Sequence, residues 1–513
     1  MKRNIILLLS IWMLALGCNA QDEATYSDVD DNDVLLYADS IWHDSIFGRK
    51  MHLQRLGGID TLVVVKQRPL VALAKDLSIN AAILAWDYYV QDRHYARISN
   101  HVLEDHFKKW PVWDGDSFSG NQFSHPYHGS LFYNAARNEG LSYGVSLLYP
   151  IIGSLTWEYF CETNPPSIND LLSTGVGGSA IGEVTHRVSD IFFDDSRVGA
   201  NRVVREIIGS ALNPVRAIHR LLTGETWRIS PSRGKRLQPQ PYSFDLGLGY
   251  RNFIEDKGNR DKMAAPYIDF EFNYGNRFNE RGKSKPYDLF SIALLANLDD
   301  KHPTVGYMEI MGRLADKQLE DRKDWKYDIG FYQHVKYVDH YSKNSQDAHN
   351  FAVISEAVSF GGGLYAEKQL RHGFFSNNTI ISDVVLGGST TDYYPYRRYN
   401  FGTGFSVRNN TVISLKKHLT FLNQFYFSKL YTIKGYTPEE ITFRTENGFG
   451  FNCWGDQGNH SIFTNNSSLQ CNLCKNLRAN ITLDLYFRNS YYKYYPTVRA
   501  KSHEWKLGII YSI

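Results

Sequence analysis

The chain ends with Trp505-Lys506-Leu507-Gly508-Ile509-Ile510-Tyr511-Ser512-Ile513. Apolar side chains alternate with polar or small ones along this stretch, and Ile510 is the one departure. Successive side chains of a β-strand point to opposite faces, so the stretch predicts a strand with one apolar and one polar face. A chain that ends in such a strand, after many similar ones, is typical of an outer-membrane β-barrel that closes on itself.

The same alternation begins after Gly234 and recurs to the C-terminus. Clear examples are residues 242–250, 268–274 and 481–487. The polar positions include four carboxylates that we expect to face a polar lumen, namely Asp245, Asp269, Glu271 and Asp484. Residues 234–513 have room for about 12 strands, and an even number is expected of such barrels. The sequence therefore predicts an antiparallel transmembrane β-barrel, with a soluble β-sandwich as the alternative.

Composition supports two domains and an envelope location. The 513 residues are too many for one ordinary domain, and the formal net charge of +2 gives no reason to expect a nucleic-acid partner. Aromatic residues make up 14% of the chain, which suits the aromatic girdles of a barrel. The mean hydropathy of −0.38 argues against a bundle of long apolar transmembrane helices, but a barrel remains compatible with it.

The N-terminus predicts export. Lys2 and Arg3 precede an apolar core from Ile5 to Leu16, so residues 1–20 are interpreted as a signal peptide, with a retained anchor as the alternative. We favour cleavage before Gln21 over lipoprotein processing at Cys18. Residues 21–76 then form a polar leader and linker. The expected destination is the cell outer membrane.

The remaining cysteines are Cys161, Cys453, Cys471 and Cys474. Cys471 and Cys474 form a CxxC, but the chain has no second CxxC to complete a zinc site. In an oxidising compartment a local disulfide near an extracellular loop or turn is favoured. Unpaired thiols are the alternative.

Residues 77–233 predict a helical domain. Apolar side chains recur three and four residues apart between Ile79 and Val90, which is typical of an amphipathic helix. The apolar run from Leu141 to Phe160 contains Pro150, so it predicts two buried helices rather than one span. Gly175, Gly178 and Gly182 would let another backbone approach closely.

Four motifs in this domain occur in a fixed order. They are His125-Pro126-Tyr127-His128-Gly129, Trp157-Glu158-Tyr159, Pro165-Pro166-Ser167-Ile168-Asn169-Asp170 and Gly182-Glu183-Val184-Thr185-His186-Arg187. Over roughly residues 80–225 the series resembles the domain-of-unknown-function family 3943. The resemblance implies an exported protein of the Gram-negative envelope, often with a barrel. The family has no established activity, so the resemblance implies no catalytic residues.

The candidate site residues lie within these motifs and are His125, His128, Glu158, Asp170, Glu183 and His186. His125 and His128 are three residues apart, as are Glu183 and His186, so on a helix each pair would share a face. Our preferred interpretation is a polar network, with Arg137 or Arg187 paired to Glu158 or Glu183. A catalytic histidine–carboxylate site is the alternative, and no metal or cofactor is assigned. Ser167 also predicts a helix N-cap, with Asp170 in the capping-box position.

Three classes of function follow. The favoured one is non-enzymatic: transport, a channel or envelope organisation, by a barrel that the helical domain packs against, plugs or lies beneath. The alternative is an enzyme that modifies an envelope lipid or glycan, with His125 or His128 as a general base. A soluble secreted binding protein is a third possibility. Expected partners are outer-membrane lipids and an envelope solute or lipid ligand.

Overall fold

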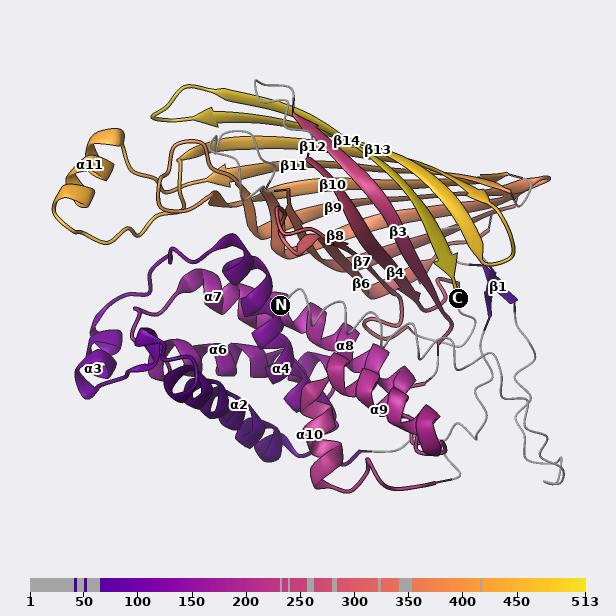
Figure 1. The fold of residues 1–513 in the computed structure, drawn as a ribbon, viewed down its shortest axis with the longest axis horizontal. Coiled ribbons are helices and arrows are strands. Elements are labelled where there is room, and N and C mark those ends of the chain that lie inside the picture. The colour runs from indigo at the N-terminus through magenta and orange to yellow at the C-terminus, as the bar shows by residue number, and fades with distance from the viewer. Residues whose placement is uncertain are drawn as a thin grey trace.

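The computed structural model describes residues 65–513, except 231–232, 239, 256–262, 279–283, 322–323, 341–352 and 416–417. It also describes two short paired strands, β1 (Ile41–His43) and β2 (Lys50–His52). The predicted signal peptide and most of the predicted leader lie outside the described residues. After these two strands comes a helical domain, and a β-barrel follows it (Figure 1).

The helical domain contains α-helices and a few tighter or wider turns. The α-helices are α2 (Pro69–Tyr89), α3 (Asn100–Lys108), α4 (His125–Asn138), α5 (Tyr143–Ser146), α6 (Leu148–Phe160), α7 (Ile168–Leu172), α8 (Gly178–Phe192), α9 (Gly199–Leu212) and α10 (Pro214–Leu222). The turns are the 3₁₀-helix η2 (His94–Ala96) and the π-helices η3 (Gly120–Ser124) and η4 (Ser173–Gly177). The first helix thus begins before the expected boundary at residue 77, with Pro69 in its first turn, where proline is tolerated.

The run from Leu141 to Phe160 forms two helices, as predicted. The break falls between α5 and α6, and Pro150 lies in the first turn of α6, where its missing N–H is not needed. The expectation that both helices are buried is only half correct. One face of α6 is exposed and carries Leu148, Ile152, Leu155 and Phe160.

Twelve antiparallel strands form a closed barrel, which confirms the predicted fold and strand number. They are β3 (Tyr242–Glu255), β4 (Met263–Tyr274), β5 (Phe290–Asn297), β6 (Val305–Gln318), β7 (Trp325–Asp339), β8 (Val353–Leu370), β9 (Gly373–Thr390), β10 (Tyr399–Leu415), β11 (Leu419–Thr432), β12 (Gly458–Asn472), β13 (Leu477–Tyr492) and β14 (Val498–Ser512). The last strand closes the barrel by pairing with the first, with Leu507 opposite Tyr250.

The barrel has two different ends. At the end that holds the start of β3 and the finish of β14, called here the terminal end, β8 and β9 are joined by a short turn. At the opposite end, called here the loop end, a long connection between β11 and β12 carries the helix α11 (Pro438–Glu446) (Figure 1). In outer-membrane barrels the short turns are periplasmic and the long loops are extracellular.

Side chains alternate across the barrel wall as the sequence predicts. Trp505, Leu507 and Ile509 are exposed on the outside, while Lys506 between them lines the lumen. Ile510, which breaks the alternation, is buried and lines the lumen. The outward-facing positions 505, 507 and 509 of β14 are therefore apolar, as contact with lipid requires.

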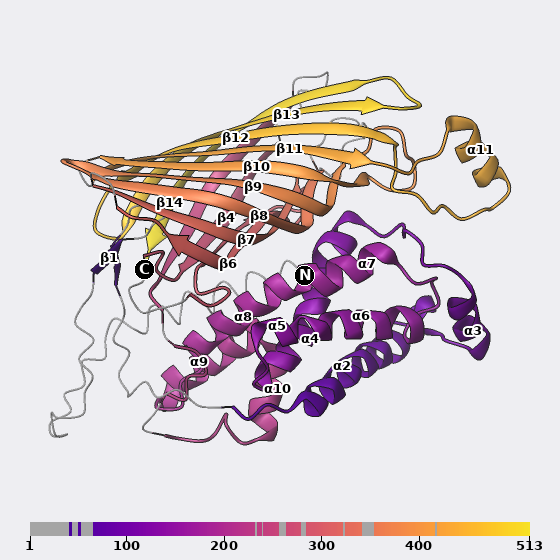
Figure 2. The same cartoon turned by 180° about the vertical axis from the view of Figure 1, so that it is seen from behind.

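The described helices of the helical domain lie along the outer wall of the barrel, neither in the lumen nor beneath one end (Figures 1 and 2). Asp269 and Glu271 of β4 face the lumen, so Phe272 and Tyr274 on alternate positions face outward. These outward-facing side chains are nevertheless buried, in one apolar cluster with Val184 of α8. The barrel wall and the helical domain thus share a core.

This contact extends along the length of the barrel. At the terminal end, the Arg187 guanidinium donates to Asp288 in the β4–β5 connection, with Nη1 and Oδ1 3.0 Å apart. At the loop end, Arg397 donates to the backbone oxygen of Asp114, 2.5 Å away. Also towards the loop end, Phe118 stacks on Tyr337 of β7 with ring centroids 4.8 Å apart.

The predicted close approach of another backbone is confirmed at Gly178, where α4 and α8 cross. A Cβ atom on Gly178 would lie 2.6 Å from the Cα of Gly129, so neither position has room for a side chain. A Cβ atom on Gly182 would lie 2.6 Å from the ring of Tyr133. The disulfide prediction is wrong, because all four cysteines in the described part of the chain are free, including Cys471 and Cys474 at the β12–β13 turn.

Candidate functional site

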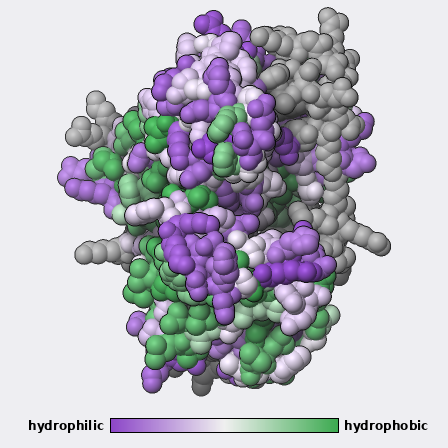
Figure 3. All heavy atoms as spheres, turned by 90° about the vertical axis from the view of Figure 1, so that its left-hand side faces the viewer, coloured by the Kyte–Doolittle hydropathy of each residue, from purple (hydrophilic) through white to green (hydrophobic). Residues whose placement is uncertain are grey.

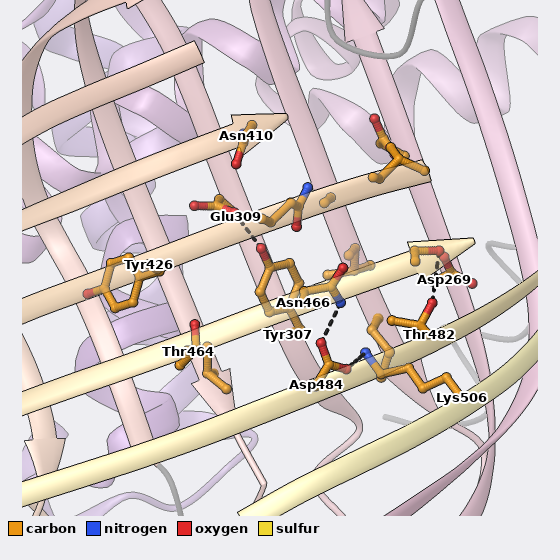
Figure 4. A pocket seen from close by; sticks show the side chains of 18 of the residues that line it. Asp269, Tyr307, Glu309, Asn410, Tyr426, Thr464, Asn466, Thr482, Asp484 and Lys506 are labelled. Carbon is orange, nitrogen blue, oxygen red and sulfur yellow. Dashed lines mark hydrogen bonds and ion pairs between the residues drawn. The ribbon is translucent and has the colours of Figure 1, made fainter. Parts of the chain in front are cut away.

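The lumen of the barrel holds a cavity of about 200 Å³ (Figure 4). Its acidic lining residues are Asp245, Asp269, Glu271, Glu309 and Asp484, and its basic ones are Lys336, Arg408 and Lys506. The expected inward direction of Asp245, Asp269, Glu271 and Asp484 is confirmed. The cavity is therefore polar, and more acidic than basic side chains line it.

An ion-pair cluster crosses the lumen. Arg408 of β10 contacts Glu309 of β6, and its Nη2 donates to Glu356 Oε2 of β8 at 2.5 Å. Tyr426 of β11 also donates to Glu356, with the two oxygens 2.7 Å apart. Because β6 and β10 are not neighbours in the barrel, the Arg408 side chain bridges the cavity.

A second group of charges lies on β12, β13 and β14. Lys506 Nζ is 2.7 Å from Asp484 Oδ2, and Asn466 donates to the other oxygen of the same carboxylate (Figure 4). Lys336 is 4.3 Å from the ring centroid of Tyr426, a cation–π contact. Charged side chains that reach into the cavity from opposite walls can bind a passing ion and release it.

The candidate residues of the helical domain do not form one site. His125, Glu158 and Asp170 belong to one cluster near the loop end, while Glu183 belongs to another. His128 and His186 join neither. His128 packs on Phe132 and Trp157, and among the described residues His128 Nε2 and His186 Nδ1 have no hydrogen-bond partner.

The first group, called here the acidic cluster, comprises Asp114, Asp116, His125, Glu158, Glu162 and Asp170. His125 Nε2 lies 3.4 Å from Asp170 Oδ1 and 3.6 Å from Asp116 Oδ2. Asp114 accepts hydrogen bonds from the amides of Asn121, at 2.8 Å, and Asn169, at 3.0 Å. Several carboxylates thus surround a single imidazole.

Burial and charge set the pKa values in the acidic cluster. Burial raises the pKa of Asp170 well above its usual range, and it raises that of Glu162 to about 8. For His125, burial alone would lower the pKa, but the carboxylates of Asp170, Asp116 and Asp114 raise it to about 9. His125 is therefore protonated at neutral pH.

Ser167 caps α7 as predicted, because its hydroxyl accepts from the Asp170 backbone N–H. The carboxylate that accepts the second hydrogen bond of the capping box differs from the prediction. Glu158 Oε2, not Asp170, accepts from the Ser167 backbone N–H at 2.7 Å. The Asp170 side chain is thereby left to face His125.

Glu183 forms the centre of the second group, together with both predicted arginines. Its carboxylate accepts from Arg137 Nε at 2.7 Å, from Arg187 Nε at 2.8 Å and from the Tyr133 hydroxyl at 2.8 Å. All its neighbours are donors, so this group is a structural ion-pair network.

One part of the acidic cluster could hold a metal ion. Asp114, His125 and Asp170 each offer one ligand atom, and these atoms lie within 4.8 Å of one another. Sequence reasoning missed Asp114 and Asp116, which lie in a connection outside the recognised motifs. The one available signal was their spacing, Asp114-Gly115-Asp116, shortly before His125-Pro126.

The fold and the lumen define an outer-membrane-type β-barrel with a helical domain on its outer wall. Within it, residues 110–215 match the family model named Domain of unknown function (DUF3943), which confirms the resemblance seen in the sequence. No curated protein matches the chain.

Among solved structures, the chain is similar to the NanC porin, with 10% identity and a TM-score of 0.26, covering 52% of this chain and 98% of that one. It is similar to outer-membrane OmpT of Vibrio cholerae, with 8% identity and a TM-score of 0.21, covering 54% and 99%. The Pseudomonas putida toluene transporter TodX has 6% identity and a TM-score of 0.21, covering 54% and 90%.

Proposed function

We propose that the protein is an outer-membrane channel for small polar solutes, with a preference for cations. The observation that supports this function best is the charged lumen inside a closed barrel. In transmembrane barrels, a polar interior of this kind provides the path for water and solutes.

The size and charge of the cavity suggest the class of solute. Its volume of about 200 Å³ is below the roughly 300–1,000 Å³ of typical small-molecule sites. Acidic lining residues outnumber basic ones by five to three. A narrow lumen with excess carboxylates favours inorganic cations and small cationic or neutral solutes over anions.

Planar-bilayer recording of the full-length protein tests the proposal. Arg408→Ala removes the side chain that bridges the lumen and leaves two carboxylates there, so single-channel conductance and cation selectivity should both rise several-fold. Arg499→Ala is the matched control, since Arg499 is an exposed arginine of β14, and its conductance should equal that of the wild type. Absence of conductance in both the wild type and Arg408→Ala, or a preference for anions, would contradict the proposal.

A second candidate function is modification of an envelope lipid or glycan at the acidic cluster. It is supported by the approach of His125 to Asp170 and Asp116. Because the pKa of His125 is raised to about 9, its imidazolium would act as a general acid rather than as a general base. His128 is less suited, because it packs between aromatic rings.

Envelope lipid and glycan profiles test this second function. Cells that carry His125→Asn should lose one modified species that wild-type cells contain. His101→Asn, which changes an exposed histidine of α3, should leave the profile unchanged. Identical profiles in all three strains would count against an enzyme.

A further inference from the structure

The outer helices of the helical domain bury charged side chains and expose apolar ones. In α9 and α10 the buried residues include Arg202, Arg205, Glu206, Arg216 and Arg220. The exposed residues of the same helices include Val203, Ile207, Ile218, Leu221 and Leu222. A helix on the surface of a water-soluble protein has the opposite arrangement.

The long helix α2 shows the same feature. Its large exposed side chains are Leu70, Val71, Leu77, Trp86, Tyr88 and Tyr89, and none of the exposed residues within Pro69–Tyr89, a range described throughout, is charged. Its charged residues turn inward, where Lys75 contacts Glu139 and Asp87 accepts a hydrogen bond from Tyr95.

Helix α2 also has the length and composition of a membrane span. Among the described residues, it is the one helix that is long and apolar enough to cross a membrane, and 17% of its apolar window is buried. That low burial distinguishes it from a core helix. Its 21 residues extend about 31 Å, close to the roughly 30 Å of a bilayer's hydrocarbon core.

These apolar faces lie beside the lipid-facing wall of the barrel. The helical domain flanks the barrel from the terminal end to the loop end (Figures 1 and 2), and apolar side chains gather on its part of the surface (Figure 3). On the uncovered wall, Leu248 and Leu507 are each 59% exposed. A bilayer around the barrel at the level of these leucines would also reach the helices.

We propose that the helical domain lies within the outer membrane beside the barrel, with the exposed faces of α2, α6, α9 and α10 in contact with lipid acyl chains. The helical domain and the barrel wall then both contact lipid. The proposal does not depend on whether the lumen conducts solutes.

The buried arginines of α10 are compatible with this location because they are paired. Arg220 Nη2 lies 2.6 Å from Glu206 Oε1 and 2.8 Å from Asp195 Oδ1. Arg216 Nη1 lies 2.7 Å from Asp190 Oδ1. Ionisable residues inside a membrane domain are expected to face its interior and to pair in this way.

Aromatic residues mark one boundary of the proposed lipid contact. Trp86, Tyr88 and Tyr89 are exposed in the last turns of α2, and Trp110 in a nearby connection is 90% exposed. Tryptophan and tyrosine are enriched where a membrane meets water. The polar, charged helix α3 follows α2 and lies beyond this boundary.

Spin labels on the full-length protein in lipid nanodiscs test the proposal. The native cysteines are replaced by alanine, and single cysteines are introduced by Leu77→Cys on α2 and Ile152→Cys on α6. Leu248→Cys on the barrel wall is the lipid reference, and Glu104→Cys on α3 is the water reference. Power-saturation measurements then compare collisions with oxygen, which concentrates in lipid, and with a water-soluble nickel complex.

We expect the oxygen-to-nickel ratio at Leu77→Cys and Ile152→Cys to match that at Leu248→Cys and to exceed that at Glu104→Cys several-fold. A ratio equal to that at Glu104→Cys would overturn the proposal by placing these faces in water. Low collision rates with both reagents would also overturn it, because a second protein copy would then cover the faces.

Discussion

At the scale of single residues, Glu183 illustrates how the helical domain tolerates buried charge. Its carboxylate is fully buried and contacts two guanidinium groups and one hydroxyl. The position of Glu183 four residues before Arg187 could be predicted from helical spacing. Its contact with Arg137 was one of the pairings that the sequence left open, because the choice depends on how α4 packs against α8.

We predict that Glu183→Gln strongly destabilises the protein. The substitution leaves Arg137 buried without its counter-charge and Arg187 with Asp288 as its remaining acidic partner, which costs about 3–5 kcal/mol. Thermal unfolding in detergent measures the effect. Glu104→Gln, which breaks an exposed pair with Lys108 within one helix, should cost less than about 1 kcal/mol. Equal stability of the two variants would refute the network.

A second prediction concerns Glu162 and pH. Burial raises the pKa of Glu162 from 4.5 to about 8, so the folded protein retains a proton that the unfolded chain releases. Its contribution to stability is therefore full below about pH 4.5 and is lost as pH rises through about 8. In Glu162→Gln, the melting temperature should fall less between pH 5 and pH 8 than in the wild type. If the melting temperatures of the two proteins change equally over this pH range, the prediction is contradicted.

At the scale of elements, the crossing of α4 and α8 depends on glycine. We predict that Gly178→Ala costs about 1–3 kcal/mol, because its Cβ atom would overlap the backbone of Gly129. Gly144→Ala is the control, since nothing lies within 4 Å of a Cβ atom at that position. Chemical unfolding in mixed micelles can compare the two variants. If Gly178→Ala is as stable as the control, the close approach does not occur.

The sequence predicted strands better than the environment of helices. Alternation across residues 242–250 and 481–487 indicated both the strands and their lumen-facing side chains, because the wall of a barrel always separates lipid from lumen. Apolar positions of α6 were interpreted as buried, although Ile152 and Leu155 are exposed. Apolar periodicity locates an apolar face, but it does not distinguish a protein core from lipid.

At the scale of the whole molecule, Gln333 of β7 connects the barrel to the helical domain. Its side-chain oxygen accepts from the Tyr143 and Tyr287 hydroxyls, and its nitrogen donates to the Val176 backbone oxygen and the Ser179 hydroxyl. The sequence offered no sign of this role. A polar residue in a strand predicts a lumen-facing position, whereas Gln333 faces outward under the helices.

We predict that Gln333→Leu loosens the docked helices while the barrel stays closed. The substitution removes four hydrogen bonds and leaves two tyrosine hydroxyls in an apolar contact, so amide exchange in η4 and α8 should become faster. Mass spectrometry resolves exchange by segment. Gln369→Leu near the β8–β9 turn should leave exchange in the helices unchanged. Unchanged exchange in Gln333→Leu would mean that Gln333 does not hold the helices.

The shared core of helices and barrel wall has a consequence for biogenesis. The helices precede the barrel in the chain, so they are synthesised before the strands that they pack on, and the barrel closes only when β14 pairs with β3. Until then, the apolar faces of α2 and α6 and the outward aromatic residues of β4 lack their final partners, which invites aggregation in water. We therefore expect the unassembled chain to need protection from aggregation, and the helices and the early strands to enter the membrane as one unit.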